Sequence, residues 1–496
     1  MRNLLQYEYA RTLNQIADFL EITHAIENPN IHGITLNSKE VRDGDLFVAL
    51  QGANAHGIAF LSDAATAGAA AVLTDNAGYE IAATMSAMPM LVTKDVRGAL
   101  GSLSSWFFGA PSHDLRLYGI TGTNGKTTVS YLLDHIWREN RRETGLMGTV
   151  EVKVGSERYP SARTTLEAPD LQALLASFSE RHIANVVMEV SSHSLALHRV
   201  DGTRFATVAF TNLSQDHLDF HGDMESYFKA KKRLFTLSFA ENAIINVDSE
   251  WGMRLYQEAS IPALDISLTD RKAAWHLLEH LPTSARGMQF SVRGPNGVLL
   301  DIQTPLVGDY NIANAMMAIA LAVDSGIDPL SAAAALSNAY GAPGRLERIE
   351  HPDGVNVLID YAHSPDAVER VIAAVKANTP GRVIGILGCG GDRDMSKRPL
   401  MGAALAHGCD IAIFTSDNPR SESAEAIIAQ MGPERFSNVE VKIDRRSAIE
   451  FGLSKAIKGD VLLILGKGHE SGQEINGVIH PFDDRAVTRE LIGNSR

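Results

Sequence analysis

The sequence predicts an α/β protein of three domains, and three features of the chain lead to that prediction. Its 496 residues suggest roughly three domains by length alone. Short apolar, β-prone segments alternate with helical patterns along most of the chain, which is typical of sheets covered by helices. Glycine and proline cluster at residues 341–344, where we expect a boundary. The predicted domains are residues 1–95, 96–343 and 344–496.

Composition and charge exclude several classes of protein. Hydrophobic residues make up 45% and charged residues 21%, which is ordinary for a globular chain. A net charge of −14 argues against nucleic acid as the main partner. Two cysteines, Cys389 and Cys409, lack metal-ligand spacing and fit a reducing compartment. Without a signal-peptide pattern or a run of about 18 apolar residues, we expect a cytoplasmic protein with no membrane span. We also expect a monomer.

The first domain contains short strands and helices but no catalytic spacing. Residues 34–38 and 45–50 are typical of strands, and residues 64–73 of a helix end that leads into a third strand. These elements predict a small N-terminal α/β domain with a binding or structural role. A helix is expected at residues 96–108, before the second domain's first strand.

A phosphate-binding loop is predicted near the start of the second domain. An apolar strand at residues 115–120 leads directly into a glycine-containing turn and then a helix, an arrangement that binds phosphate. Lys126 would reach the terminal phosphates, and Thr127 would bind Mg²⁺. Ile120 occupies the first glycine position of the strict P-loop pattern, so a glycine-rich turn with one surface lysine is the alternative. The turn consists of Gly122, Thr123, Asn124, Gly125, Lys126, Thr127 and Thr128.

Two more strands of this P-loop ATPase-like, parallel-sheet domain end in polar residues. Residues 183–190 are typical of a buried strand, and Glu189 near its end is at a position suited to Mg²⁺, although a strand-end surface charge is the alternative. Residues 207–211 lead into the His- and Asp-rich loop 212–222, for which a metal or phosphate role is natural. The alternative for each single histidine is a hydrogen-bonded core residue.

Two helices of the second domain carry polar side chains of open interpretation. Lys229, Lys231, Lys232 and Arg233 follow the His/Asp loop, and a solvated basic face is their default interpretation. Asn311 and Asn314 lie one turn apart at the start of an alanine-rich helix. Their amides could bind a base edge or only cap the helix.

The third domain is predicted to be a Rossmann-like, doubly wound sheet. Its strands are residues 355–363, 382–388, 410–416 and 460–466, with helical patterns between them. Each strand ends in polar residues, and ligands of open α/β sheets bind at such carboxyl ends. The Gly-Cys-Gly-Gly sequence at 388–391 lacks the final glycine of a dinucleotide fingerprint, so it is weak evidence for a dinucleotide.

An ordered set of motifs resembles the Mur ligases, ATP-dependent ligases of peptidoglycan precursors that are related to folylpolyglutamate synthetase. The resemblance covers nearly the whole chain and implies a UDP-binding N-terminal domain. The motifs are residues 121–128, 188–193, 211–222, 344–347, 360–363 and 466–470.

The resemblance implies ATP and Mg²⁺ as cofactors and an acyl-phosphate mechanism. ATP phosphorylates a substrate carboxylate, and the incoming amine then displaces phosphate through a tetrahedral intermediate. Lys126, Glu189, His217 and Lys231 would be catalytic. Thr127, Glu189, His217 and Lys231 would bind the metal, with Lys231 as its carbamate. Asn311 would face adenine, while Arg345 and Asp360 would reach the nucleotide from the third domain.

The resemblance also assigns two further substrates. Residues 417–420 resemble the motif of members that add meso-diaminopimelate to UDP-N-acetylmuramoyl-L-alanyl-D-glutamate. Arg163 and Leu197 depart from the Asn and Gln of some relatives. The UDP end would lie at Leu36, Ser38, Ala53, Asn54 and Ala55, and the peptide end at Thr164, Thr165, Ser191 and Arg199. Diaminopimelate would contact Arg393, Asp417, Asn418, Pro419, Arg420, Gly466 and Glu470.

Two other functions stay open. The first is a ligase of the same fold with lysine or a folate as substrate. Arg420 argues against lysine, and the N-terminal domain argues against the folate enzymes. The second is a nucleotide-dependent switch or transporter ATPase, which would hydrolyse ATP without needing both a UDP-muramoyl peptide and an amino acid.

Overall fold

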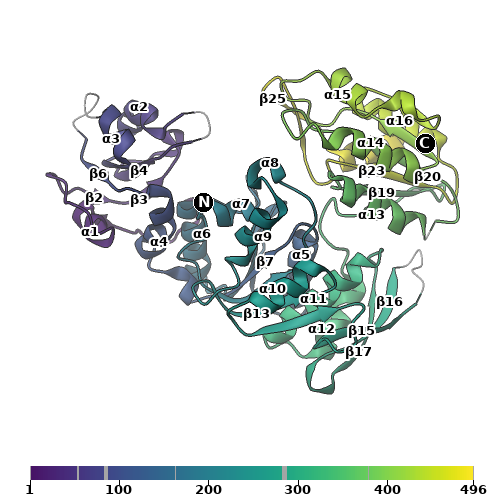
Figure 1. The fold of residues 1–496 in the computed structure, drawn as a ribbon, viewed down its shortest axis with the longest axis horizontal. Helices are drawn as coiled ribbons and strands as arrows, with labels where there is room; N and C mark the ends of the chain where they lie inside the picture. Colours follow the sequence, from purple (N-terminus) through teal and green to yellow (C-terminus); the bar gives the residue numbers. More distant parts are fainter. Residues whose placement is uncertain are drawn as a thin grey trace.

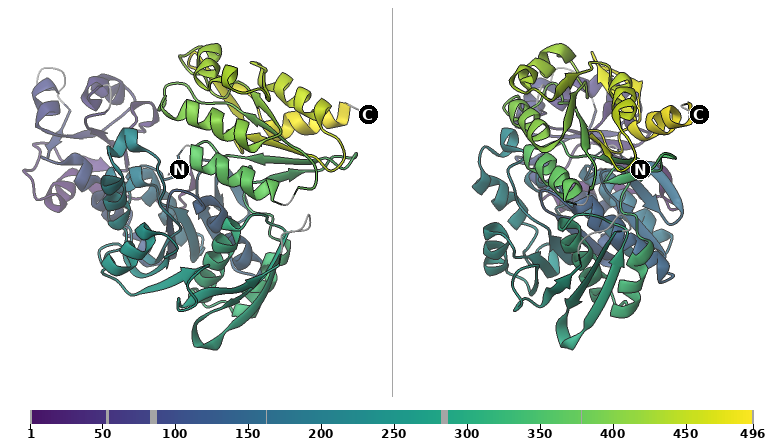
Figure 2. Two further views of the ribbon diagram at one scale, coloured as in Figure 1. Left: turned by 45° about the vertical axis from the view of Figure 1, so that its right-hand side comes forward. Right: turned by 90° about the vertical axis from the view of Figure 1, so that its right-hand side faces the viewer.

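The computed structural model describes residues 2–52, 55–82, 88–161, 163–281, 287–377 and 379–494. Three bodies follow one another along the chain (Figure 1). In Figure 1 the N-terminal body lies to one side, and in all views of Figures 1 and 2 the C-terminal body lies above the central body. No helix among the described residues is long and apolar enough to cross a membrane.

The N-terminal body is a small parallel sheet with helices. Its strands pair in the order β3-β4-β5-β6. The strand expected at 34–38 ends at Thr35, because Asn37 caps a 3₁₀ turn that starts at Ser38. The elements are β1 (Arg11–Thr12), α1 (Leu13–Phe19), β2 (Asn30–Ile31), β3 (Gly33–Thr35), β4 (Asp45–Ala49), α2 (Leu61–Thr66), β5 (Ala71–Thr74), α3 (Asn76–Ala82) and β6 (Met90–Val92).

A single helix, α4 (Val96–Phe107), joins the first two bodies. Leu100 and Leu103 of α4 share a core with Leu46 of the N-terminal sheet and Ala173 of α6 (Ala168–Glu180) in the central body. The helix therefore packs against both neighbours instead of acting as a free linker.

The central body contains an eleven-stranded sheet in the order β10-β9-β8-β11-β7-β12-β13-β14-β15-β16-β17. Its middle is parallel, as the sequence predicts, while β9, β10, β16 and β17 add antiparallel edges that the sequence analysis missed. The strands are β7 (Arg116–Thr121), β8 (Thr144–Met147), β9 (Glu151–Val154), β10 (Glu157–Pro160), β11 (Asn185–Glu189), β12 (Phe205–Phe210), β13 (Ala240–Asn246), β14 (Ala263–Ser267), β15 (Trp275–His280), β16 (Met288–Arg293) and β17 (Leu299–Thr304).

Two hydrophobic cores lie on the two faces of the central sheet. Side chains of β7 alternate between them, with Tyr118 and Ile120 on one face and Leu117 on the other. Helices α5, α11 and α12 cover the first face, and α6, α9 and α10 cover the second. The helices are α5 (Lys126–Glu139), α7 (Ser192–Ala196), α8 (Leu218–His221), α9 (Met224–Lys232), α10 (Glu250–Glu258), α11 (Tyr310–Asp324) and α12 (Pro329–Ala335).

The C-terminal body is a six-stranded sheet in the order β18-β19-β23-β20-β21-β22, parallel except for β18. This confirms the predicted doubly wound sheet, although β18, β22 and the hairpin β24–β25 were missed. The elements are β18 (Glu347–Ile349), β19 (Asn356–Asp360), α13 (Pro365–Lys376), β20 (Val383–Leu387), α14 (Lys397–Gly408), β21 (Ile411–Phe414), α15 (Ala424–Gln430), β22 (Val439–Val441), α16 (Arg445–Lys455), β23 (Val461–Leu465), β24 (Gly472–Ile475), β25 (Val478–Pro481) and α17 (Asp484–Asn494).

Candidate active site

The predicted phosphate loop connects β7 to α5 in the middle of the central sheet. Gly122 has φ 148° and Gly125 has φ 89°, and both pack closely. A Cβ on Gly122 would lie 2.0 Å from Thr211 Oγ1, and one on Gly125 would lie 2.5 Å from Asn314 Oδ1. Any other residue would be crowded and strained at these positions. The first N–H groups of a helix have no partner within the helix and can bind an anion.

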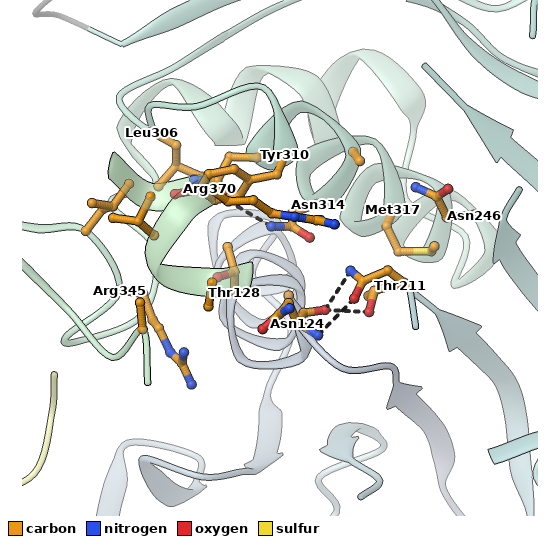
Figure 3. A pocket seen from close by; sticks show the side chains of 18 of the residues that line it. Asn124, Thr128, Thr211, Asn246, Leu306, Tyr310, Asn314, Met317, Arg345 and Arg370 are labelled. Carbon is orange, nitrogen blue, oxygen red and sulfur yellow. Dashed lines mark hydrogen bonds between the residues drawn. The ribbon is translucent and has the colours of Figure 1, made fainter. Parts of the chain in front are cut away.

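The loop that follows β12 holds the phosphate loop in place. Thr123 N and Asn124 N donate to the main-chain oxygen and Oδ1 of Asn212, at 2.9 and 3.0 Å. Thr211 Oγ1 donates to Asn124 O at 2.6 Å, as Figure 3 shows. The ends of β7 and β12 are neighbours in the sheet, with Phe210 opposite Thr121, which brings the two loops together.

Lys126 lies over the loop. Its Nζ donates to Gly122 O at 3.0 Å and to Thr123 O at 2.8 Å. Burial lowers the pKa of Lys126, although the nearby carboxylate of Glu189 opposes that effect. The side chain is half-buried and bonds two main-chain oxygens of the loop, which argues against the alternative of a free surface lysine.

Glu189 is fully buried at the end of β11, which excludes a strand-end surface charge. Its Oε2 accepts from Thr127 Oγ1 at 2.9 Å and from Thr149 Oγ1 at 3.0 Å. Its Oε1 accepts from Thr149 N at 2.9 Å. A hydroxyl oxygen and a carboxylate oxygen thus lie side by side at the phosphate loop, and Mg²⁺ prefers such oxygen ligands.

The described residues fit a Mg²⁺ that is held mainly by a nucleotide. No three His, Cys, Asp or Glu side chains in the part of the chain described here converge as a metal site. Mg²⁺ often takes one or two protein oxygens and completes its shell with phosphates and water. Thr127 and Glu189 supply such a pair. The ring of His217 lies 4.7 Å from that of His193, and burial lowers the pKa of His217.

The default interpretation of the basic residues on α9, a solvated basic face, is wrong for Lys231. It is 1% exposed, and its Nζ donates to Gly122 O at 2.9 Å. Burial and the nearby charge of Lys126 hold its pKa well below the usual value. The Lys229 side chain is 69% exposed, and Lys232 pairs with Glu258 at 2.7 Å, so the solvated face includes those residues but not Lys231.

A cavity of about 320 Å³ adjoins the phosphate loop between the central and C-terminal bodies. Figure 3 shows Tyr310, Asn314 and Met317 of α11 on its wall. Asn314 Nδ2 donates to Asn311 Oδ1 at 2.9 Å, and Asn311 Nδ2 donates to Val307 O at 2.8 Å. The two amides share a face, as predicted, and both line the cavity.

Arg345 and Asp360 bring the C-terminal body to the same cavity. Arg345 Nη2 lies 3.5 Å from Thr127 Oγ1, and its guanidinium stacks 4.6 Å from the centre of the Tyr361 ring. Asp360 accepts from Leu346 N at 2.7 Å and from Ala362 N at 2.8 Å. Burial raises the pKa of Asp360.

A second cavity, of about 370 Å³, lies between the His/Asp loop and the strand ends of the C-terminal body. Tyr361 and His363 line both cavities, so the two adjoin. The remaining walls include His193, Asp216, His217, Gly390, Arg393, Asp394, Lys397, Asp417, Asn418, Arg420, Gly466 and Glu470.

Residues 417–420 form a constrained turn at the end of β21. Arg420 has φ 52°, its N donates to Glu474 O at 3.0 Å, and its Nε lies 3.2 Å from Glu474 Oε2. Its Nη1 donates to Gly391 O at 2.7 Å. Asn418 Nδ2 donates to Glu470 Oε2 at 2.8 Å. Arg393 is exposed at the same cavity, and a Cβ on Gly466 would lie 2.6 Å from Asp417 Oδ2.

Of the residues expected at the peptide end, Thr165 contacts Glu189 directly, Thr164 contacts Thr149, and Arg199 pairs with Glu167. Thr165 Oγ1 donates to Glu189 O at 2.8 Å and accepts from Ser191 N at 3.1 Å. Thr164 Oγ1 lies 3.1 Å from Thr149 Oγ1, and Arg199 Nη2 lies 2.8 Å from Glu167 Oε1.

The proposed UDP-end residues belong to the N-terminal body. Leu36 and Ser38 follow β3, and Ala55 is exposed. Ala53 and Asn54 lie outside the described residues.

Sequence reasoning missed several residues that shape the site. Thr149 binds Glu189, Lys397 binds Asp216, and Lys467 and Glu474 bind the 417–420 turn. Their roles depend on contacts between distant segments, and only Lys467 lies inside a motif that the sequence analysis used.

Three family models match the chain in order. "Mur ligase family, catalytic domain" matches residues 30–105, "Mur ligase middle domain" matches 120–322, and "Mur ligase, glutamate ligase domain" matches 344–468.

Individual relatives match over nearly their full lengths. A UDP-N-acetylmuramoyl-L-alanyl-D-glutamate--2,6-diaminopimelate ligase of Streptomyces coelicolor is 46% identical over 490 residues, covering 97% of this chain and 96% of that protein. The same ligase of Aquifex aeolicus is 42% identical over 465 residues, covering 93% and 94%. A solved structure of this type of ligase has a TM-score of 0.67 at 32% identity and covers 97% of this chain and 99% of its own.

Proposed function

This chain belongs to the Mur ligase family, and from that premise we propose that it joins meso-diaminopimelate to UDP-N-acetylmuramoyl-L-alanyl-D-glutamate with the conversion of ATP to ADP and phosphate. The bond forms at the side-chain carboxylate of the D-glutamyl residue, and the reaction takes place in the cytoplasm. The observation that carries this proposal is a cavity in which Arg420, Asn418 and Glu470 meet next to the nucleotide cavity. The names of the relatives support the same substrates.

ATP binds in the cavity beside the phosphate loop. The amides of Asn311 and Asn314 line its α11 side and offer donors and acceptors to adenine. Residues 122–128 surround the phosphates with main-chain N–H groups, and Lys126 adds a cation. Arg345 and Asp360 complete the cavity from the C-terminal body, so a full site needs both bodies together.

Thr127, Glu189 and His217 would hold Mg²⁺, the first two through oxygens that lie 2.9 Å apart. When bound, the ion neutralises negative charge on the phosphates. Thr149 orients the Glu189 carboxylate by bonding both of its oxygens.

We also propose that Lys231 carries a carbamate. A buried amine with a lowered pKa is a free nucleophile, and its nitrogen can attack the carbon of CO₂. The new N–C bond and the loss of one proton convert a cation into an anionic oxygen group. An anion at this position suits a metal site better than a second ammonium beside Lys126.

The chemistry proceeds in two steps that the adjoining cavities can hold in sequence. A carboxylate oxygen of the substrate attacks the γ-phosphorus of ATP, and ADP leaves. One ammonium of diaminopimelate loses a proton to solvent, and the resulting amine attacks the acyl carbon. The tetrahedral intermediate loses a second proton from this nitrogen, its C–O bond to phosphate breaks, phosphate leaves, and an amide remains. Lys126 stabilises charge during the transfer, and closure between the two bodies excludes water from the acyl phosphate.

The nucleotide-sugar substrate spans the N-terminal and central bodies. The UDP end is assigned to Leu36, Ser38 and residues 53–55, and the peptide end to Thr164, Thr165, Ser191 and Arg199. Because Thr165 bonds the main chain of Glu189, the peptide end would lie beside the phosphate loop.

The acceptor amino acid carries two carboxylates and two ammonium groups. Arg393 and Arg420 suit the carboxylates, since a guanidinium can bond a carboxylate with two parallel hydrogen bonds. Glu470 suits an ammonium. Asn418 adds a neutral donor, while Asp417, Pro419 and Gly466 shape the turn around it.

One assay tests this function. ADP release is measured with the UDP-dipeptide and each of meso-diaminopimelate, lysine, ornithine and no amino acid. We expect release to require both the UDP-dipeptide and diaminopimelate. ADP release at a similar rate with lysine in place of diaminopimelate would instead support another acceptor. ADP release without any amino acid would support a simple ATPase.

A further inference from the structure

Lys467 is a fully buried lysine that the proposed chemistry does not use. It follows Gly466 at the carboxyl end of β23 and is 0% exposed. Burying an ammonium is costly unless it is hydrogen-bonded and paired with opposite charge. The groups that bind the Lys467 ammonium therefore indicate its role.

Three oxygen atoms accept hydrogen bonds from Lys467 Nζ. Glu470 Oε2 lies at 2.9 Å, Gly472 O at 2.7 Å and Asn418 Oδ1 at 3.2 Å. Asp417 Oδ1 lies further away, at 4.0 Å. An ammonium has three N–H donors, so every donor has an acceptor. Two of these acceptors belong to residues assigned above to the amino acid.

Lys467 fixes which way the Asn418 amide points. Asn418 Oδ1 accepts from Lys467 Nζ and from Glu474 N, at 3.2 and 3.0 Å. Both partners can only donate, so the oxygen must face them and Nδ2 must face the opposite side. There Nδ2 donates to Glu470 Oε2 at 2.8 Å. Without Lys467, one of the two donors that set this orientation is lost.

Lys467 also favours the charged form of the two carboxylates beside it, and for Glu470 the net shift of the pKa is downward. Burial alone would raise the pKa of Glu470. The charge and hydrogen bond of Lys467 and the hydrogen bond from Asn418 together lower this pKa by more than burial raises it, so the net shift is downward. Burial raises the pKa of Asp417, and Lys467 opposes that shift. Glu470 must be ionised to receive an ammonium.

We infer that Lys467 is a positioning residue for the acceptor amino acid, which presents the Asn418 amide and the Glu470 carboxylate to it in one fixed arrangement. This inference rests on the proposed function, because that function assigns the cavity to an amino acid. Lys467 does not itself contact the substrate, and it is not a catalytic residue.

Steady-state kinetics of Lys467→Met tests the inference, with each substrate varied in turn. We expect the KM for diaminopimelate to rise about tenfold to a hundredfold, the scale of losing a hydrogen bond to a charged group. The KM values for ATP and the UDP-dipeptide should stay nearly unchanged. Lys458→Met is the matched control, because Lys458 is an exposed lysine of the same body. If Lys467→Met does not fold, Lys467→Gln, which keeps a donor without the charge, carries the same test.

A double-mutant cycle with Asn418→Ala separates positioning from a general structural role. If Lys467 acts through Asn418, the double variant should lose much less affinity for the amino acid than the sum of the two single losses. An unchanged diaminopimelate KM in Lys467→Met, equal weakening of all three substrates, or strictly additive losses would overturn the inference. If the wild-type protein uses a different amino acid, the proposed function fails, and the same cycle with that amino acid still decides the role of Lys467.

Discussion

Lys397 and Asp216 form an ion pair between the C-terminal and central bodies, with Nζ 2.8 Å from Oδ1. Lys397 is the first residue of α14, and Asp216 directly precedes His217. The two side chains are 20% and 9% exposed, so water screens the pair only in part. Burial alone would raise the pKa of Asp216. The charges of His217, His363 and Lys397 together lower this pKa by more than burial raises it, so the net shift is downward. The pair links the amino-acid cavity to the His/Asp loop.

Lys397→Ala should weaken this link. Asp216 would then be a buried carboxylate that has lost a hydrogen-bonded cation, and closure of the two bodies would be less favourable. We expect kcat/KM for diaminopimelate to fall about tenfold or more. Steady-state kinetics measures this, with Lys458→Ala as control. A double-mutant cycle with Asp216→Asn should show coupling between the two sites, and strictly additive losses would show that the pair does not act as a unit.

Lys126→Ala should remove most of the activity. The cation over the phosphate loop is lost at the place where negative charge develops during phosphoryl transfer. A loss of about a hundredfold or more in kcat/KM is expected. The measurement is ADP release at saturating ATP, with the exposed Lys229→Ala as control. Near-native turnover of Lys126→Ala would refute the assignment of the loop.

Lys231→Ala tests the carbamate. The variant should be nearly inactive, and short carboxylic acids should restore part of its activity by placing an oxygen anion in the vacated space. Lys232→Ala, on the exposed face of the same helix, should retain activity. Crystallography or intact-mass measurement of the active, ligand-bound enzyme should find the carbamate. Finding only the free amine there would contradict the proposal.

The protein should lose stability as the pH falls below about 6.5, in part because of His469. Burial, with help from Arg345, lowers the pKa of His469 to about 4. Between pH 4 and 6.5 the unfolded chain therefore holds a proton at this residue that the folded protein does not, and unfolding becomes more favourable as the pH decreases. The fall in Tm between pH 7 and pH 5 should be smaller in His469→Gln than in the wild type. His480→Gln, at an exposed position, should behave like the wild type.

Local pattern sufficed to predict the parts of the fold that depend on neighbours in sequence. The strand, glycine turn and helix around Lys126 follow from apolar β-prone residues, two glycines with positive φ and a helical period. The four main strands of the C-terminal sheet were equally predictable, since each is a short apolar run that ends in polar residues.

Contacts between distant segments could not be predicted in the same way. Lys231 lies between the exposed Lys229 and the half-buried Lys232 on α9, and its burial depends on the packing of that helix against the phosphate loop. Glu474 belongs to a hairpin in which Val478 and Ile479 are exposed, so no apolar alternation marked it as structured. Thr149 reaches Glu189 only because β8 and β11 pair.

Selectivity for diaminopimelate should depend on Arg420. Diaminopimelate differs from lysine by one extra carboxylate at its far end, so discrimination must come from a group that binds it. Glu474 and Gly391 O hold the guanidinium of Arg420 at the rim of the amino-acid cavity. With lysine bound, the guanidinium would keep Glu474 but lack the second carboxylate of the substrate. A site built to bond a polar group of its substrate can reject the analogue that lacks that group by roughly 10⁴-fold. Arg420→Ala should raise the KM for diaminopimelate strongly and leave those for ATP and the UDP-dipeptide nearly unchanged. Arg420→Lys should restore little, because a point charge cannot form two parallel hydrogen bonds. Kinetics with each substrate varied in turn decides the matter, and a wild-type enzyme that used lysine equally well would point to another acceptor.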